Sequence, residues 1–260
     1  MSMITSNVIN SCDTFFVFKG NDLLIKKSSI IELPDREIVQ KFFDQHYAID
    51  WFFEDNKSYF TVALEENVPA LNGFCWINLR QLFATDYALI GLCSRALALL
   101  NWRNTARFCG SCGGALQDDK FETARICPFC GNVFFPHISP VVLVLVKKDD
   151  KLLLVRQNHG NSNVYTCPAG FLEPGESLEV CAIREVKEEC GISIKNIKYC
   201  SSQQWPYPDQ LLIGVTADWA EGDLVSQRNE LNEAKWFLPD DLPPVPKAGS
   251  MVYELIKNFS

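Results

Sequence analysis

The chain has 260 residues, 47% of them hydrophobic and 22% charged, and its formal net charge at pH 7 is −8. This length allows about two or three small domains, and the composition is that of an ordinary soluble globular protein. The negative charge argues against nonspecific binding to nucleic acids or to anionic membranes.

The first residues lack the basic and apolar segments of a signal peptide, and no apolar run reaches the roughly 18 residues of a membrane-spanning helix. We therefore expect a cytoplasmic protein that makes no membrane contact. The eleven cysteines are spread over a long chain, so they fit reduced thiols and a metal site better than a disulfide framework.

Residues 1–104 are expected to form an N-terminal α+β domain. Strand-like runs cover 14–20 and 58–64, and the patterns at 35–45 and 86–102 are typical of helices. This part of the chain carries no chemical motif, so its residues do not indicate a function.

A segment rich in cysteine and glycine follows at 105–136. Cys109 and Cys112 form one C-x2-C pair, Cys127 and Cys130 form another, and fourteen residues separate the pairs. Four thiolates at this spacing, on glycine-bearing turns, suit tetrahedral zinc. A closed four-thiolate site leaves no coordination position for a substrate, so we predict a structural Zn²⁺ in a zinc ribbon. Two redox-active cysteine pairs are the alternative.

The remaining residues, 137–260, alternate apolar runs with loops. Two apolar runs within 140–157 flank a charged turn and predict a β-hairpin. Further strands are expected at 211–219 and 233–238, and a closing helix at 250–259.

A glutamate-rich segment lies between the hairpin and these strands. Glycine and proline at 170–175 suit a sharp loop, and a helix is expected to begin at Glu176 or Ser177 and to stop at Gly191. Helical periodicity gathers three glutamates on one face: Glu185, Glu188 and Glu189. It predicts a packed opposite face formed by Ile183, Val186 and Cys190.

Like charges at this spacing destabilise an isolated helix, and Mg²⁺ or Mn²⁺ would compensate because these ions prefer carboxylate oxygens. An acidic face that contacts only solvent is the alternative. The order of residues favours the metal. It reads G-x5-E-x7-R-E-V-x-E-E-x-G-I, from Gly170 to Ile192, and it resembles the Nudix hydrolase signature at every fixed position.

The resemblance implies an α/β (α+β) fold, with a Nudix α/β/α sandwich built on a mixed sheet. It also implies hydrolysis of a nucleoside diphosphate linked to another group. Glu185 and Glu189 would be the principal metal ligands, and Glu188 would be a further ligand or the base that acts on water. Arg184 would hold the loop glutamates by ion pairing.

The order of parts is similar to that of the NADH pyrophosphatase family: an N-terminal domain, a four-cysteine ribbon and a Nudix domain at 137–260. The stretches "CGSCGG" and "CPFCGNVFFPHISP" resemble the ribbon pattern of this family. The resemblance implies a homodimeric enzyme that cleaves NADH or NAD to nicotinamide mononucleotide and AMP with Mg²⁺ or Mn²⁺. It further implies removal of NAD caps from RNA.

The stretch "SQQWPYPDQ", 202–210, resembles the S-Q-P-W-P-F-P-x-S motif that the family associates with its dinucleotide substrate. By this resemblance the substrate-binding residues are Ser202, Gln203, Trp205, Tyr207 and Gln210. Positions 204, 207 and 210 depart from the motif. Phe171 and Phe135 stand where the family has aromatic residues that flank the nicotinamide ring across a dimer interface. Glu230 stands where the family has an extra metal ligand, with Glu233 as a near competitor.

Two other functions remain open. The altered loop is compatible with a preference for ADP-ribose, FAD or a dinucleoside polyphosphate. A regulator without catalysis, with the ribbon as a nucleic-acid module, is the second alternative. The signature carboxylates Glu176, Glu185, Glu188 and Glu189 are all present, which favours catalysis.

Overall fold

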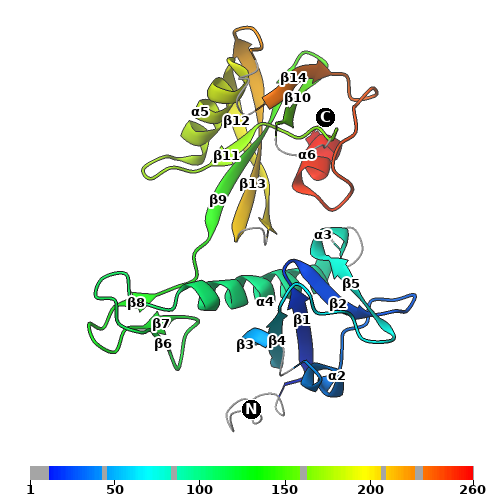
Figure 1. Cartoon of the computed structure of the whole chain (residues 1–260). Helices are drawn as coiled ribbons and strands as arrows, with labels where there is room; N and C mark the ends of the chain where they lie inside the picture. The colour runs from blue at the N-terminus through cyan, green and yellow to red at the C-terminus, as the bar shows by residue number, and fades with distance from the viewer. Residues whose placement is uncertain are drawn as a thin grey trace. The chain divides into compact units, whose positions relative to one another are not determined.

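A computed structural model of the chain describes residues 12–42, 46–82, 87–158, 163–205, 209–225 and 231–259. The chain forms two compact units, Met1–His137 and Ile138–Ser260 (Figure 1). Among the helices in the described ranges, none combines the length and the apolar character that a membrane crossing requires.

The N-terminal unit is built on a five-stranded sheet in the order β3-β4-β1-β2-β5. Its strands are β1 Thr14–Lys19, β2 Asp22–Lys26, β3 His46–Glu54, β4 Lys57–Leu64 and β5 Phe74–Asn78. The described helices of this unit are α2 Arg36–Gln40, α3 Leu79–Leu82 and α4 Tyr87–Thr105. The long helix α4 packs on β1, β3 and β4. Helix α2 has only five residues, so the helix expected over 35–45 is much shorter than its pattern indicated.

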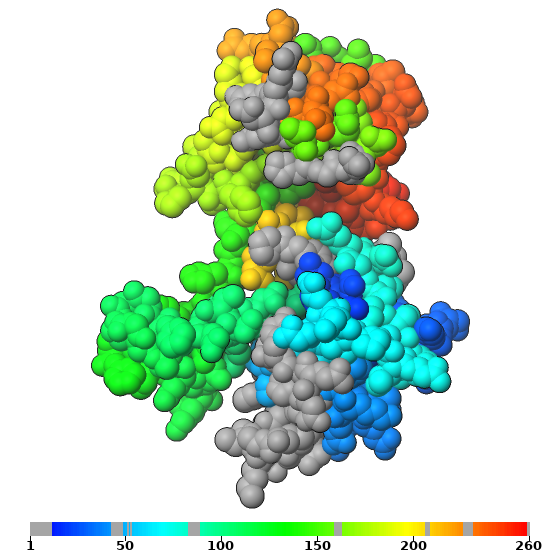
Figure 2. Space-filling model, in the orientation of Figure 1, coloured from blue at the N-terminus to red at the C-terminus, as the bar shows by residue number. Residues whose placement is uncertain are grey.

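The zinc-ribbon segment belongs to the same compact unit and follows directly from α4. It contains three short antiparallel strands, β6 Gln117–Asp118, β7 Arg125–Ile126 and β8 Val133–Phe134. In the space-filling view its residues, coloured green, form a protruding lobe of this unit (Figure 2).

The C-terminal unit is built on a six-stranded mixed sheet in the order β12-β13-β9-β10-β14, with β11 paired to β9. Its strands are β9 Ser139–Lys148, β10 Lys151–Gln157, β11 Ala169–Phe171, β12 Ser193–Trp205, β13 Gln210–Glu221 and β14 Leu231–Phe237. Strand β13 runs parallel to β9, whereas the other pairs are antiparallel. The hairpin predicted within 140–157 is confirmed as β9 and β10.

One helix covers each face of this sheet. Helix α5, Leu178–Cys190, packs on the face that presents Val142, Val144 and Val146 of β9. Helix α6, Met251–Phe259, packs on the face that presents Val141, Leu143 and Leu145. Alternate residues of one buried strand therefore serve two cores, and the predicted α/β/α sandwich on a mixed sheet is confirmed.

Candidate metal-dependent active site and zinc centre

Local capping chemistry fixes both ends of α5. The Ser177 hydroxyl accepts a hydrogen bond from the Val180 N–H at 3.4 Å, as an N-cap residue does. Gly191 adopts a φ of 75°, a left-handed conformation that glycine tolerates, and its N–H donates to the Lys187 carbonyl at 3.0 Å. Of the two predicted starting points, Glu176 and Ser177, the structure uses Ser177, and the predicted stop at Gly191 is confirmed.

The packing face of α5 differs from the predicted one. Ile183 is 47% exposed, whereas Glu189 is only 5% exposed. The expectation that Ile183 packs with Val186 and Cys190 is therefore wrong for Ile183. The buried arc is centred on Ala182 and Glu189, about 50° around the helix from Val186. This rotation brings the Glu189 carboxylate under the sheet, where it accepts a hydrogen bond from the Ala169 N–H of β11 at 3.3 Å.

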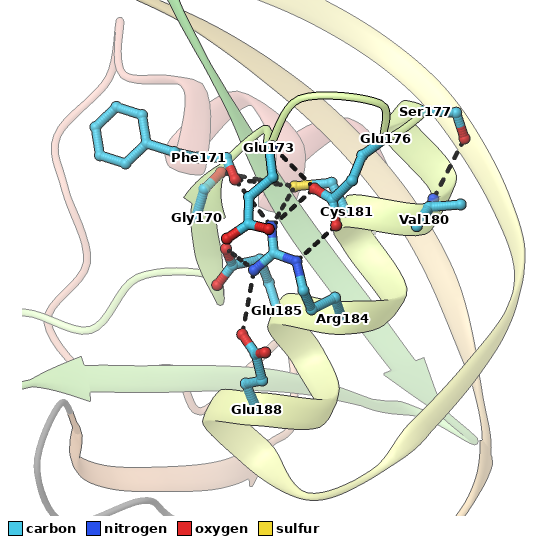
Figure 3. Close-up of polar contacts among 10 residues, drawn as sticks. All are labelled: Gly170, Phe171, Glu173, Glu176, Ser177, Val180, Cys181, Arg184, Glu185 and Glu188. Carbon is cyan, nitrogen blue, oxygen red and sulfur yellow. Dashed lines mark hydrogen bonds and ion pairs between the residues drawn. The ribbon is translucent and has the colours of Figure 1, made fainter.

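Arg184 binds three glutamates of the signature at once (Figure 3). Its Nε and one terminal nitrogen donate to the two oxygens of Glu176 at 2.6 and 2.9 Å. The other terminal nitrogen donates to Glu185 at 2.7 Å and to Glu188 at 3.1 Å. The guanidinium also donates to the Phe171 carbonyl at 3.0 Å. The pair with Glu176 is the contact with a loop glutamate that the resemblance implied. Arg184 also ties the helix and strand β11 to this loop.

The charges around Arg184 shift the pKa of their neighbours. The hydrogen bond from Arg184, followed by that from the Glu173 N–H, lowers the pKa of Glu176 to about 2. In return, the bond to Glu176 raises the pKa of Arg184, so both groups are charged at neutral pH. Burial raises the pKa of the Cys181 thiol to about 11, which leaves a neutral sulfur 3.6 Å from the guanidinium.

Strand β11 is shaped to receive the Glu185 carboxylate. A Cβ placed on Gly170 would lie 1.8 Å from Oε1 of Glu185, so only glycine leaves room for this side chain. The Glu185 side chain is 13% exposed and that of Glu188 is 55% exposed. Within this cluster the carboxylates outnumber the one arginine. Their hard oxygens are the donors that Mg²⁺ and Mn²⁺ prefer, so the residues fit a divalent cation that neutralises the excess charge.

The register of the sheet relates this site to the substrate motif. Phe171 pairs with Val141, Val141 with Leu212, and Leu212 with Gln203, so Phe171 and Gln203 lie on one rung across four strands. Paired residues point to the same face, and Val141 and Leu212 belong to the core beneath α6. The predicted residues on the α6 face are therefore Phe171, Gln203, Trp205 and Gln210. Ser202 pairs with Ile213 and lies on the α5 face, within 3.3 Å of the Tyr199 hydroxyl.

Phe135 belongs to the N-terminal unit and is 53% exposed. Tyr207 and Glu230 lie outside the described residues. The competitor Glu233 accepts a hydrogen bond from the Tyr165 hydroxyl and pairs with Lys235 on the α6 side of the sheet, so its carboxylate is engaged away from α5.

The four ribbon cysteines converge as predicted. Their sulfur atoms all lie within 4.8 Å of one another, and this is the one such convergence of metal-binding groups in the described ranges. Both pairs use the same turn: the first cysteine N–H binds the carbonyl five residues on, at 2.8 and 2.9 Å. The glycine after each pair, Gly113 or Gly131, has a φ of 74° or 76°. Burial opposes ionisation of Cys109, but the N–H groups of Ser111 and Cys112 prevail and lower its pKa to about 6. The four converging thiols are therefore suitable ligands for Zn²⁺.

Two arginines that carry no sequence motif join the ribbon to the rest of its unit. Arg125 donates to the carbonyls of Arg103, Ala106 and Leu116 at 3.2, 2.7 and 3.0 Å, so it caps the C-terminal end of α4. Arg103 forms ion pairs of 3.0 Å with the buried Asp50 of β3 and with Asp118 of β6. No local sequence pattern predicts these ion pairs, because Arg103, Asp50 and Asp118 come from three separate segments of the chain.

Three family models match the chain. The NADH pyrophosphatase-like rudimentary NUDIX domain matches residues 12–102, the NADH pyrophosphatase zinc ribbon domain matches 104–135, and the NUDIX domain matches 136–259. Sequence reasoning missed the rudimentary Nudix character of the first part, because that part lacks the signature residues.

Curated relatives align along most of the chain. A protein of Pseudomonas syringae pv. tomato called NAD-capped RNA hydrolase NudC is 36% identical over 250 residues, which cover 95% of this chain and 86% of that protein. A protein of the same name from Chromobacterium violaceum is 35% identical over 246 residues, with coverages of 93% and 89%.

Among solved structures, a NUDIX hydrolase of Nitrosomonas europaea superposes with a TM-score of 0.51 at 23% identity, covering 59% of this chain and 92% of that one. This likeness supports the fold. The family matches and the curated relatives show that the chain belongs to the zinc-ribbon NADH pyrophosphatase family of Nudix hydrolases.

Proposed function

We propose that this protein hydrolyses the pyrophosphate bond of NADH or NAD to nicotinamide mononucleotide and AMP, and that it removes NAD caps from RNA. The observation that carries the proposal is the Arg184 cluster, which holds Glu176, Glu185 and Glu188 of the signature together and places the Glu185 carboxylate beside Gly170 of β11. The curated relatives named NAD-capped RNA hydrolase support the choice of substrate.

Glu185, Glu188 and Glu189 are proposed to hold Mg²⁺ or Mn²⁺, with Glu230 as a further ligand. When bound, such an ion neutralises phosphate charge and lowers the pKa of a coordinated water. Arg184 orients Glu185 and Glu188 through its two short contacts. Glu188 is the most exposed carboxylate of the cluster, which supports its role as a further ligand or as the base that takes the proton of the attacking water. The water oxygen bonds to one phosphorus as the bridging P–O bond breaks.

The α6 face supports substrate binding. Phe171 is 51% exposed there, and its ring points away from the glutamates in Figure 3. We propose that Phe171 and Phe135 stack on the nicotinamide ring, with Phe135 supplied by a second copy in a homodimer. Half-exposed rings at both positions support this arrangement. Ser202, Gln203, Trp205, Tyr207 and Gln210 are proposed to line the rest of the dinucleotide site.

Zn²⁺ in the ribbon is proposed to be structural, and the cytoplasm is the proposed compartment because a zinc site of free thiols requires reducing conditions. We propose domain limits of 1–104, 105–136 and 137–260. The matched ranges of the three family models support these limits.

The test uses the zinc-loaded full-length protein with Mg²⁺ or Mn²⁺ and with NADH, NAD, ADP-ribose and FAD in separate reactions. Products are identified by mass spectrometry. Nicotinamide mononucleotide and AMP formed fastest from NADH or NAD support the proposal. A faster reaction of ADP-ribose or FAD would move the assignment to the related hydrolases, for which the changed Gln210 is the specific observation. If none of these substrates is cleaved, the alternative of a non-catalytic regulator that binds nucleic acid through its zinc ribbon is favoured.

Glu189→Gln is the matched catalytic variant. It is expected to keep the fold and to lose at least about a hundredfold in rate, because the amide is a poor ligand for the cation. Glu179→Gln on the exposed side of the same helix is the control and is expected to keep the wild-type rate. An unchanged rate in Glu189→Gln would remove this residue from the metal site.

A further inference from the structure

Gln203 of the substrate motif is bound at both ends of its amide by the protein itself. Its Nε2 donates to the Gly249 carbonyl at 2.7 Å, and its Oε1 accepts from the Met251 N–H at 3.0 Å. The side chain is half-buried and spans the backbone on both sides of Ser250. Gln203 therefore makes a two-point contact between strand β12 and the start of α6.

This contact satisfies backbone groups that α6 leaves open. The first N–H groups of a helix have no partner within the helix. The Ser250 hydroxyl accepts from the Tyr253 N–H at 3.3 Å and donates to the Lys247 carbonyl at 2.8 Å, as a local cap. The Met251 N–H is satisfied by Gln203, so a residue from another strand completes the cap.

The start of α6 is also packed tightly on the sheet. A Cβ on Gly214 of β13 would lie 2.8 Å from the Met251 sulfur and 3.0 Å from Leu255, so the helix rests directly on this glycine. The Ser201 hydroxyl of β12 contacts the same sulfur at 3.2 Å. Ser201 and Gly214 are a register pair, two rungs from the Gln203 rung and therefore on the same face of the sheet. The helix start is thereby fixed to the two strands that carry the ends of the substrate motif.

The substrate face borders this contact. Gln203 and Phe171 share a rung, and three strand spacings of ~4.8 Å place their backbones about 14 Å apart. Trp205 and Gln210 pair with each other on the same face, one side-chain row beyond Gln203. A dinucleotide that stacks on Phe171 and reaches Trp205 therefore passes in front of the α6 start.

We infer that Gln203 is a positioning residue, which sets the dinucleotide site by fixing the start of α6 against the strand end that carries Trp205 and Gln210. This inference rests on the proposed function and changes the role of Gln203 within it, because the amide acts through Gly249 and Met251. The ligand class is a dinucleotide pyrophosphate. Because the position of the α6 start affects the whole site, loss of the Gln203 contact weakens the binding of every such substrate, including substrates that differ in one half.

The test compares Gln203→Met with the wild type and with Gln204→Met, a change at the exposed neighbour on the opposite face. Methionine keeps the length of the side chain and removes both hydrogen bonds. For each variant, KM and kcat are measured with NADH, NAD and ADP-ribose. Hydrogen exchange of a peptide covering 249–256 is followed by mass spectrometry, and zinc content and thermal unfolding are recorded.

In Gln203→Met we expect KM to rise about tenfold for every substrate, kcat to change less than about threefold, and exchange at 249–256 to accelerate about tenfold. Gln204→Met is expected to match the wild type in all these readouts. A raised KM with unchanged exchange would show direct substrate contact and overturn the inference. Faster exchange with unchanged KM would show a purely structural role and overturn it as well.

Failure of the proposed function gives a separate result. If the wild type cleaves none of the substrates, the proposed activity fails, and the exchange measurement still decides the contact. Unchanged exchange in Gln203→Met would then overturn the positioning role on its own.

Discussion

The Glu185 carboxylate occupies the space beside Gly170 that any other residue would fill with its Cβ, at 1.8 Å from Oε1. Gly170 does not have a positive φ, so alanine at this position strains no backbone and acts only by displacing the carboxylate. We expect Gly170→Ala to lower kcat by about a hundredfold or more, because Glu185 can no longer hold its position for the cation.

Steady-state kinetics with NADH check this prediction. Gly91→Ala in α4, where a Cβ meets open space, is the matched control and keeps the wild-type kcat. A wild-type kcat in Gly170→Ala would show that the position of Glu185 is not needed.

Arg184→Lys keeps the positive charge and loses the planar fork that binds both oxygens of Glu176. Lysine cannot reach Glu176, Glu185 and Glu188 together, so the loop before α5 loses its anchor. We expect kcat/KM to fall more than about tenfold and the free energy of unfolding to fall by about 1–3 kcal/mol. Steady-state kinetics measure kcat/KM, and urea denaturation measures the free energy of unfolding. Lys187→Arg, on an exposed side of the same helix, is the control and is expected to change neither quantity.

Glu176 makes stability depend on acid pH. Its pKa is about 2 in the folded protein against an ordinary value of 4.5, so its ion pair contributes fully above that ordinary value and is lost as the pH falls toward 2. The Tm difference between the wild type and Glu176→Gln is therefore expected to be largest near neutral pH and to shrink through this window. Thermal scans of the zinc-loaded protein without added Mg²⁺ or Mn²⁺ test it. A constant difference across the range contradicts the pairing.

Zinc and the N-terminal domain are expected to be coupled through Arg125. Cys112→Ser should lose the zinc and lower the Tm, whereas Arg125→Met should keep one zinc per chain and still lower the free energy of unfolding by about 3 kcal/mol. Truncation leaves the carbonyls at the end of α4 without their donor. Elemental analysis and calorimetry separate the two effects.

Arg107→Met is the control for this coupling because its side chain is exposed. A zinc-loaded Arg125→Met protein with wild-type stability would refute the coupling.

The parts of the site that the sequence predicted are those governed by neighbours in the chain. The two cysteine turns need only four thiols and two glycines at fixed spacing, and both formed as expected. The limits of α5 follow from the capping chemistry of Ser177 and Gly191, which acts within one helical turn. The contacts of Arg184 with Glu176 and Glu188 also span only a few residues.

The parts that sequence reasoning missed depend on contacts between distant segments. Glu189 is buried and bonded to the Ala169 N–H of β11, whereas Ile183 is exposed; helical periodicity does not encode this contact with a strand. Arg125 is one basic residue in an ordinary segment, and its partners lie at the end of α4. The contacts of Gln203 with α6 join residues almost fifty positions apart, beyond any local pattern.

The two faces of the C-terminal sheet carry different parts of the proposed site. The carboxylates of α5 gather beneath Gly170, while Phe171, Gln203, Trp205 and Gln210 lie on the α6 side. The signature carboxylates and these four residues proposed for recognition therefore rest on separate hydrophobic cores. The departures from the family motif at positions 204, 207 and 210 all fall in the β12–β13 segment, outside α5 and its loop. The signature residues of α5 and its loop are all retained beside these departures.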